Sequence, residues 1–140
     1  MKKVLLMSAL LCVSLVLFAC GDSSETSSRS TNDVIDGLVS TGLISDVVVD
    51  LPNDEFGGSR EEGKRILVPS LGEDAGGRVF KFKNEKGLNE AKKYYDDLGK
   101  SSPLFYSHTH ANGLFLLQMN GDMSDEDFEK LKVAMDEALK

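Results

Sequence analysis

Apolar and polar positions divide the chain into three parts. After the basic start Met1-Lys2-Lys3, positions 4–19 are almost wholly apolar, with two serines and one cysteine as the exceptions. Positions 20–30 are polar, and positions 31–140 mix apolar and polar residues in regular patterns. A positive start, an apolar run and a small final residue are typical of an export signal. The pattern therefore predicts a signal peptide over residues 1–19 and a folded part further on.

The apolar run can alternatively be interpreted as a transmembrane anchor. Its 16 residues are fewer than the roughly 20 that a helix needs to span a bilayer. The residues directly after it, 21–25, are polar and acidic, so no positive charge stops transfer across the membrane. Both observations favour a removable signal over an anchor of this kind.

The apolar run ends in Leu17-Phe18-Ala19-Cys20, which resembles the lipobox of bacterial lipoproteins. The residue types suit the chemistry, because a thiol must accept diacylglycerol and the small Ala19 gives a signal peptidase access to the bond before Cys20. Phe18 is bulkier than the usual occupant of its position. We expect cleavage between Ala19 and Cys20, lipidation of Cys20, and attachment to the extracytoplasmic face of the cell membrane. Acylation of the new amino group would strengthen this attachment, because a single chain anchors only marginally.

Cleavage would leave Cys20 as the only cysteine, so the mature chain offers no disulfide, thiol nucleophile or thiolate metal site. Residues 20–30 predict a lipidated cysteine followed by a flexible serine-rich tether. The loss of Lys2 and Lys3 takes the formal charge from −7 to −9. Such an acidic surface argues against nucleic acid and against electrostatic docking on anionic lipid. Residues 31–140 suit a single domain with one core.

Apolar periodicity beyond residue 30 predicts three helices and at least four strands. Helices are expected at 31–41, 84–98 and 125–139, and Gly42 and Gly99 are expected to end the first two. Strands are expected at 65–70, 78–83, 103–109 and 114–120, with an uncertain fifth around Val47 and a loop over 52–64. Asn112-Gly113 is a strong signal for a tight turn between the last two strands.

The resulting order is helix, strand, strand, helix, strand, strand, helix, which can be divided into two helix-strand-strand units and a terminal helix. A helix with one apolar stripe needs a sheet face to cover. We therefore expect an α+β fold with an antiparallel sheet of about four strands and all helices packed on one face.

His108 and His110 form the first candidate site. Residues two apart on a strand share a face, so both imidazoles could reach one metal ion. A metal site needs a third ligand, and the predicted turn places the apolar Phe115 and Leu117 opposite the histidines. The alternative is a pair of partly exposed histidines near a hairpin tip, and we expect neither a bound metal nor another cofactor.

The glycine-rich segment before the second strand is the next candidate. Its glycines allow close approach of the backbone, and Arg78 could hold a carboxylate or phosphate. Glu73 and Asp74 would repel an anion, however, and the spacing fits neither the phosphate-loop nor the dinucleotide fingerprint. A mobile hairpin loop and a protein-contact loop both remain open. The residues considered for such a contact are Gly72, Glu73, Asp74, Gly76, Gly77 and Arg78.

Two aromatic pairs are a further candidate for contact with a partner. One member of Tyr94-Tyr95 and one of Phe105-Tyr106 must face away from the core, and an exposed aromatic side chain can anchor a partner. Tyr94 and Tyr106 are therefore candidate contact residues, with partial cover by a loop as the alternative.

Catalytic chemistry finds little support in the sequence. No serine lies in a nucleophile-elbow motif, and no Ser-His-Asp order is convincing. The acidic stretch 120–127 resembles a calcium loop, but Asp125 occupies the position of the obligatory glycine. Acidic residues at a helix start are explained by the helix dipole alone. We expect no enzyme and assign no catalytic residue.

Three segments resemble a known group of proteins. Val68–Arg78, Tyr94–Ser102 and Leu117–Asp122 are similar to stretches of small, functionally obscure lipoproteins of Gram-positive bacteria, some carried by prophages. The resemblance covers about half of the chain, from Ile66 to Glu137. It implies membrane anchoring outside the cell and no established catalysis.

The sequence leaves three hypotheses for the folded part. The first is a non-catalytic binding module for an unknown protein partner, with a prophage-type surface role as a special case. The second is capture of a metal or small solute through His108 and His110. The third is a cell-envelope hydrolase, which would need a buried pair of carboxylates in a cleft.

Overall fold

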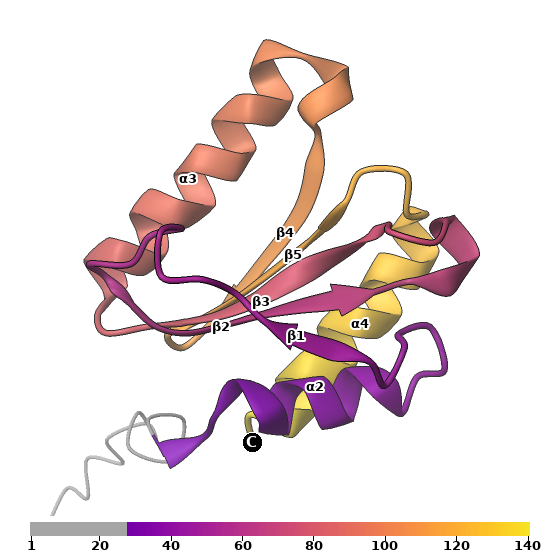
Figure 1. Cartoon of the computed structure of the whole chain (residues 1–140), viewed down its shortest axis with the longest axis horizontal. Coiled ribbons are helices and arrows are strands. Elements are labelled where there is room, and N and C mark those ends of the chain that lie inside the picture. The colour runs from indigo at the N-terminus through magenta and orange to yellow at the C-terminus, as the bar shows by residue number, and fades with distance from the viewer. Residues whose placement is uncertain (1–27) are drawn as a thin grey trace, which may run out of the picture.

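A computed structural model describes residues 28–140 of the chain. The predicted signal peptide, its cleavage site and Cys20 lie outside the described residues. Five strands form one antiparallel sheet in the order β1-β2-β3-β5-β4 (Figure 1). The strands are β1 Val48–Asp50, β2 Arg60–Leu67, β3 Gly76–Phe82, β4 Ser107–Asn112 and β5 Phe115–Asn120. The helices are α2 Thr31–Val39, α3 Glu85–Ser101 and α4 Asp125–Ala138, with short 3₁₀ turns η1 Pro69–Leu71 and η2 Pro103–Phe105.

The predicted α+β class with an antiparallel sheet is confirmed, but the helices do not share one face. Helices α2 and α4 cover one face of the sheet and α3 covers the other (Figure 1). The central strands explain the difference, because β3 and β5 are apolar on both sides. Val79 and Leu117 pack with α2 and α4, whereas Phe80 and Leu116 pack with α3. Successive side chains of a strand point to opposite faces, so the consecutive apolar runs supply two cores.

The sheet has five strands where about four were expected. The uncertain run near Val47 becomes β1, and β2 begins at Arg60, inside the segment expected to be a loop. The Arg60 side chain is buried, and its Nη2 donates to the carbonyl oxygens of Leu51 (3.1 Å) and Pro52 (2.7 Å). Arginine is normally an exposed polar residue, so its presence at position 60 favoured a loop. For this reason the first half of β2 was not predicted from the sequence.

Gly42 has the predicted left-handed conformation, although α2 already ends at Val39 with Ser40 as its C-cap, and Gly99 does not end α3. Gly42 follows α2 with φ 76°, the left-handed conformation that glycine adopts without strain. Helix α3 continues past Gly99 to Ser101. A Cβ at Gly99 would lie 3.2 Å from Cδ2 of Tyr106, so this glycine lets η2 and the start of β4 pack closely against the helix. None of the helices among residues 28–140 is long and apolar enough to cross a membrane.

The hairpin between β4 and β5 is confirmed, with its turn one residue further along. Asn112 pairs with Phe115, so Gly113 and Leu114 form the turn, and Gly113 has φ 56°. A glycine with positive φ at the first turn position is typical of a type II′ hairpin. The shift moves every cross-strand pair by two positions from the predicted register.

Candidate functional site: a groove at the open end of the sheet

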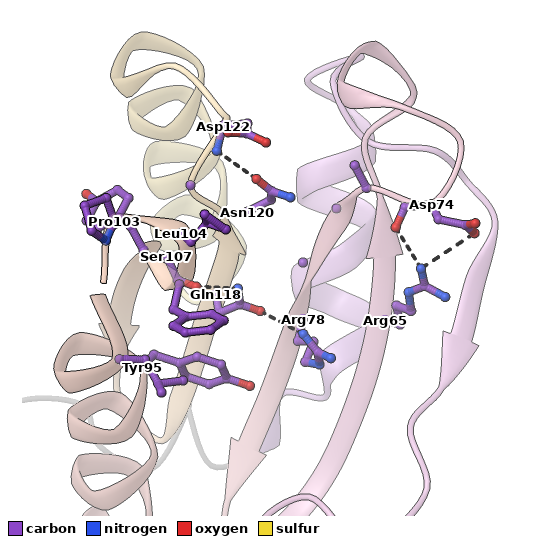
Figure 2. Close-up of a pocket in the computed structure, with 17 residues that line it drawn as sticks. Arg65, Asp74, Arg78, Tyr95, Pro103, Leu104, Ser107, Gln118, Asn120 and Asp122 are labelled. Atoms are coloured by element: carbon purple, nitrogen blue, oxygen red, sulfur yellow. Dashed lines mark hydrogen bonds and ion pairs between the residues drawn. The ribbon is translucent and has the colours of Figure 1, made fainter. Parts of the chain in front are cut away.

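A groove of about 700 Å³ lies on the α3 face of the sheet, between η2 and the loop that joins β2 to β3 (Figure 2). It exists because α3 covers only part of this face. Phe80 of β3 and Leu116 of β5 lie under the helix. The next positions on the same side of these strands, Arg78 and Gln118, are polar and line the groove, Arg78 partly exposed and Gln118 buried. A change from apolar to polar residues along two paired strands therefore marks where the groove begins.

Polar side chains form the floor of the groove. Arg78 Nη1 lies 3.4 Å from Gln118 Oε1, and Gln118 Nε2 donates to Ser107 Oγ at 2.9 Å. Arg78 Nε lies 3.1 Å from Glu55 Oε2, which comes from the loop before β2. These contacts hold the Arg78 guanidinium in place while a third of its side chain stays exposed. The floor can therefore offer hydrogen-bond donors to a ligand.

The two walls of the groove differ in character. Leu104, Phe105 and Tyr106 form an apolar wall and are 84%, 58% and 48% exposed. On the opposite wall Arg65 Nη2 donates to the Asp74 carbonyl oxygen at 2.8 Å and lies 3.8 Å from its carboxylate (Figure 2). The groove thus places apolar surface opposite an ion pair of arginine and aspartate.

The expectation for the aromatic pairs is confirmed for one pair and not for the other. Tyr95 is buried and Tyr94 exposed, because the two occupy different faces of α3. Phe105 and Tyr106 are both largely exposed, because β4 begins only at Ser107 and the 3₁₀ turn before it does not alternate its side chains. Tyr106 lines the groove, whereas Tyr94 lines a smaller adjoining pocket of about 340 Å³.

Tyr95 contributes a neutral hydroxyl to this region. It lines both the groove and the smaller pocket, which also contains Glu55 and Arg78. Burial raises the pKa of Tyr95 to about 12. The phenol is therefore protonated at physiological pH and can both donate and accept a hydrogen bond.

The glycines of the 72–78 segment serve the sheet more than a ligand. A Cβ at Gly76 would overlap the carbonyl oxygen of Ile66, and one at Gly77 would overlap that of Gln118. Both glycines belong to β3 and allow β2 and β5 to approach it closely. Of the six residues considered for a contact, those that line the groove are Asp74, Gly76, Gly77 and Arg78, whereas Gly72 and Glu73 do not.

The histidines each contact a different partner within the domain. His108 Nε2 lies 2.8 Å from the Met123 carbonyl oxygen, and its ring stacks on Phe128. His110 Nε2 lies 2.8 Å from Asp136 Oδ1. Their cross-strand partners are Met119 and Leu117, which corrects the predicted pair Phe115 and Leu117. Among residues 28–140 no group of three or more His, Cys, Asp or Glu side chains is placed to hold a metal ion.

The environment of Asp136 predicts a loss of stability in acid. Burial alone would raise the pKa of Asp136, but hydrogen bonds from His110 and Asn112 outweigh it and hold the pKa below its usual 3.8. A lowered carboxyl pKa stabilises the fold above the unfolded-state pKa, and this contribution disappears as the pH falls through the lower folded-state pKa.

We therefore expect Asp136→Asn to cost roughly 1 kcal/mol at pH 7, a value reduced for the partial exposure of this side chain. The difference from the unsubstituted protein should shrink as the pH falls from about 5 towards 3. Urea unfolding at several pH values measures both effects. Asp36→Asn, at an exposed position of α2, is the control. A difference that stayed constant over this pH range would contradict the assignment.

The hydrolase hypothesis needs a buried pair of carboxylates. The buried polar or charged residues of the described part of the chain are Thr31, Arg60, Lys81, His108 and Gln118. Asp and Glu do not occur in this set, so residues 28–140 do not provide such a pair.

The sequence did not identify several residues of the groove, namely Leu104, Ser107, Gln118 and Asn120, nor Glu55 of the adjoining pocket. Gln118 carried a usable signal, because it interrupts the apolar run of β5 at a position that pairs with Arg78. Comparisons of the chain with models of protein families, with curated proteins and with solved structures find no match.

Proposed function

We propose that the protein is a lipid-anchored extracytoplasmic lipoprotein whose domain is a non-catalytic binding module. The anchoring rests on the signal pattern and on Cys20, and the binding surface is the groove. The observation that supports the binding surface is that Arg78 lines the same groove as the exposed side chains of Leu104, Phe105 and Tyr106. Aromatic and arginine side chains dominate the binding energy of protein interfaces, and the groove has the size of a typical ligand site.

The position of the groove suits a tethered protein. The described chain enters the domain at α2, where Glu62 accepts hydrogen bonds from the Thr31 backbone nitrogen (3.0 Å) and hydroxyl (2.6 Å). Helix α2 lies on one face of the sheet (Figure 1), and the residues of the groove lie on the opposite face, which α3 partly covers. A tether attached at Thr31 therefore leaves the groove free to meet another molecule. A prophage-type role at the cell surface is one special case of such binding.

Site-specific photocrosslinking in intact cells tests the binding surface. A benzoylphenylalanine at Phe105 should give adducts, whereas the same group at Val133 of α4 should give few. The two positions match in exposure, at 58% and 59%, and lie on different sides of the sheet. Adducts from Phe105 should also decrease several-fold in an Arg78→Gln background. Equal adducts from both positions, or none from either, would refute the groove as the binding surface.

A further inference from the structure

Each arginine of the groove is held by a carboxylate from a loop of the same chain. Glu55 pairs with Arg78 from the loop before β2, and Asp74 pairs with Arg65 from the loop before β3. Planar guanidinium groups bind carboxylates well because two parallel hydrogen bonds match the geometry of both partners. The groove therefore already contains the kind of anion that its arginines recognise.

The ion pair of Glu55 and Arg78 leaves two buried polar atoms without a hydrogen bond. Their Oε2 and Nε atoms are buried and only 3.1 Å apart, yet neither atom makes a hydrogen bond of acceptable geometry within residues 28–140. A buried polar atom without a proper hydrogen bond costs free energy, so this pair gains less than its distance implies. Both side chains are more than a third exposed, Glu55 at 39% and Arg78 at 34%, so a ligand can reach the pair.

The neighbour of Glu55 adds a second sign of strain. Phe56 has φ 54°, a conformation that bulky residues rarely adopt. Its ring is held by edge contacts with Phe80 (5.7 Å between ring centroids) and Tyr94 (5.6 Å). These ring contacts hold the loop before β2 against the core, while the side chain of Glu55 extends towards Arg78. Strained backbone that is maintained by its surroundings occurs often at ligand sites and switches.

Resting on the proposed function of the groove, we infer that its ligand is the free carboxyl end of a peptide with an apolar last residue. The terminal carboxylate takes the place of the Glu55 carboxylate on Arg78. The last side chain packs against Leu104 and Phe105, and Gln118 and Ser107 meet the peptide backbone between these points. Glu55 thus acts as an internal competitor that the ligand displaces.

Charge and position favour this occupant over other anions and over a membrane. Asp74 and Asp122 also line the groove, and a ligand with one negative charge is repelled less by them than a doubly charged phosphate. The apolar wall lines the groove on the α3 face of the sheet, whereas α2, where the described chain begins, covers the other face. The wall is therefore clear of the segment that leads to the tether, and the charge of −9 expected for the mature chain disfavours docking on anionic lipid.

Fluorescence anisotropy on the full-length lipoprotein in dodecyl maltoside micelles tests the inference. The probes are a fluorescein-labelled pool of tetrapeptides ending in Phe, Leu or Tyr with free carboxyl ends, and the same pool with amidated ends. The free-acid pool should bind at least about tenfold more tightly than the amidated pool, because only the acid supplies the partner for Arg78. Equal binding of the two pools, or no binding of the acids, would overturn the inference.

Substitutions separate competition from simple structural support. Glu55→Gln should tighten binding of the free acids about fivefold, because the competing charge is removed, and Arg78→Gln should weaken it at least about tenfold. Glu61→Gln removes a comparable ion pair, 3.4 Å from Lys81 on the other side of the sheet, and should leave the affinity unchanged. Circular dichroism and thermal unfolding confirm that each variant is folded.

The outcomes distinguish this inference from the proposed function. Weaker binding by Glu55→Gln would show that Glu55 helps to form the site and would end the competitor model. Failure of the free acids with persistent, position-specific crosslinking at Phe105 would reject the peptide-carboxylate ligand but keep the groove. Failure of both experiments would reject the groove itself.

Discussion

Gly77→Ala is expected to destabilise the domain by at least about 3 kcal/mol, whereas Gly58→Ala should be nearly neutral. The added Cβ at Gly77 would overlap the backbone carbonyl oxygen of Gln118 and would lie 2.5 Å from Met119 Sδ. A flexible side chain could turn away from such a contact, but the backbone of a paired central strand cannot. At Gly58 nothing lies within 4 Å of the corresponding Cβ position.

The cost at Gly77 arises from the position of β3 in the sheet. Strand β3 is paired on both sides, with β2 and with β5, so any outward shift breaks hydrogen bonds on one side or the other. Total stabilities of small domains are about 5–15 kcal/mol, so a loss of this size removes a large fraction of the stability. Urea unfolding followed by circular dichroism measures the difference. A midpoint for Gly77→Ala close to that of Gly58→Ala would contradict the close approach of β3 and β5.

The substitution at Gly77 also affects the groove in a way that can be measured. Arg78 follows Gly77 directly, and Gln118 supplies both the oxygen that the Cβ would meet and the side chain that contacts Arg78. Molecules of Gly77→Ala that remain folded should therefore bind ligands more weakly than expected from their stability alone.

The approximate positions of the helices and of most strands could be predicted from the sequence, because both depend on local periodicity. The stripe of Phe128, Leu131 and Met135 defines the buried face of α4, and the side chain of Ser124 caps its first turn. The presence of a core on both faces of the sheet was harder to predict. A continuous apolar run such as Phe115 to Leu117 does not alternate with polar residues, so it does not show which faces of the strand are buried. Arg60 was read as part of a loop for the opposite reason, since its burial depends on carbonyl groups of the preceding loop.

The groove could be predicted only in fragments. The sequence indicated Arg78 and Tyr106 as contact residues, but it gave no reason to join them. Their proximity depends on the β3–β5–β4 pairing and on the direction in which α3 leaves the sheet. Glu55 meets Arg78 across 23 positions of the sequence, through a loop whose course is set by Phe56 and Arg60. Such contacts are properties of the assembled fold and leave no local pattern.

Cys20→Ser is expected to abolish incorporation of labelled palmitate completely, and Cys12→Ser should leave it unchanged. Cys12 and Cys20 are the two cysteines of the chain, and only Cys20 follows the small residue at the end of the apolar run. A serine hydroxyl cannot replace the thiol that accepts diacylglycerol. Without that modification the precursor should also remain uncleaved at Ala19, which gives a larger species on a denaturing gel.

Labelling is a better measure than cell fractionation for this prediction. An uncleaved precursor keeps the apolar positions 4–19, and such a run can hold it at the membrane without any lipid. The mature chain would depend on acyl chains, because its charge of −9 disfavours anionic lipid surfaces and each buried methylene adds about 0.8 kcal/mol of membrane affinity. Persistent palmitate labelling in Cys20→Ser would refute the predicted lipid anchor. Loss of labelling in Cys12→Ser would indicate that Cys12, and not Cys20, carries the lipid.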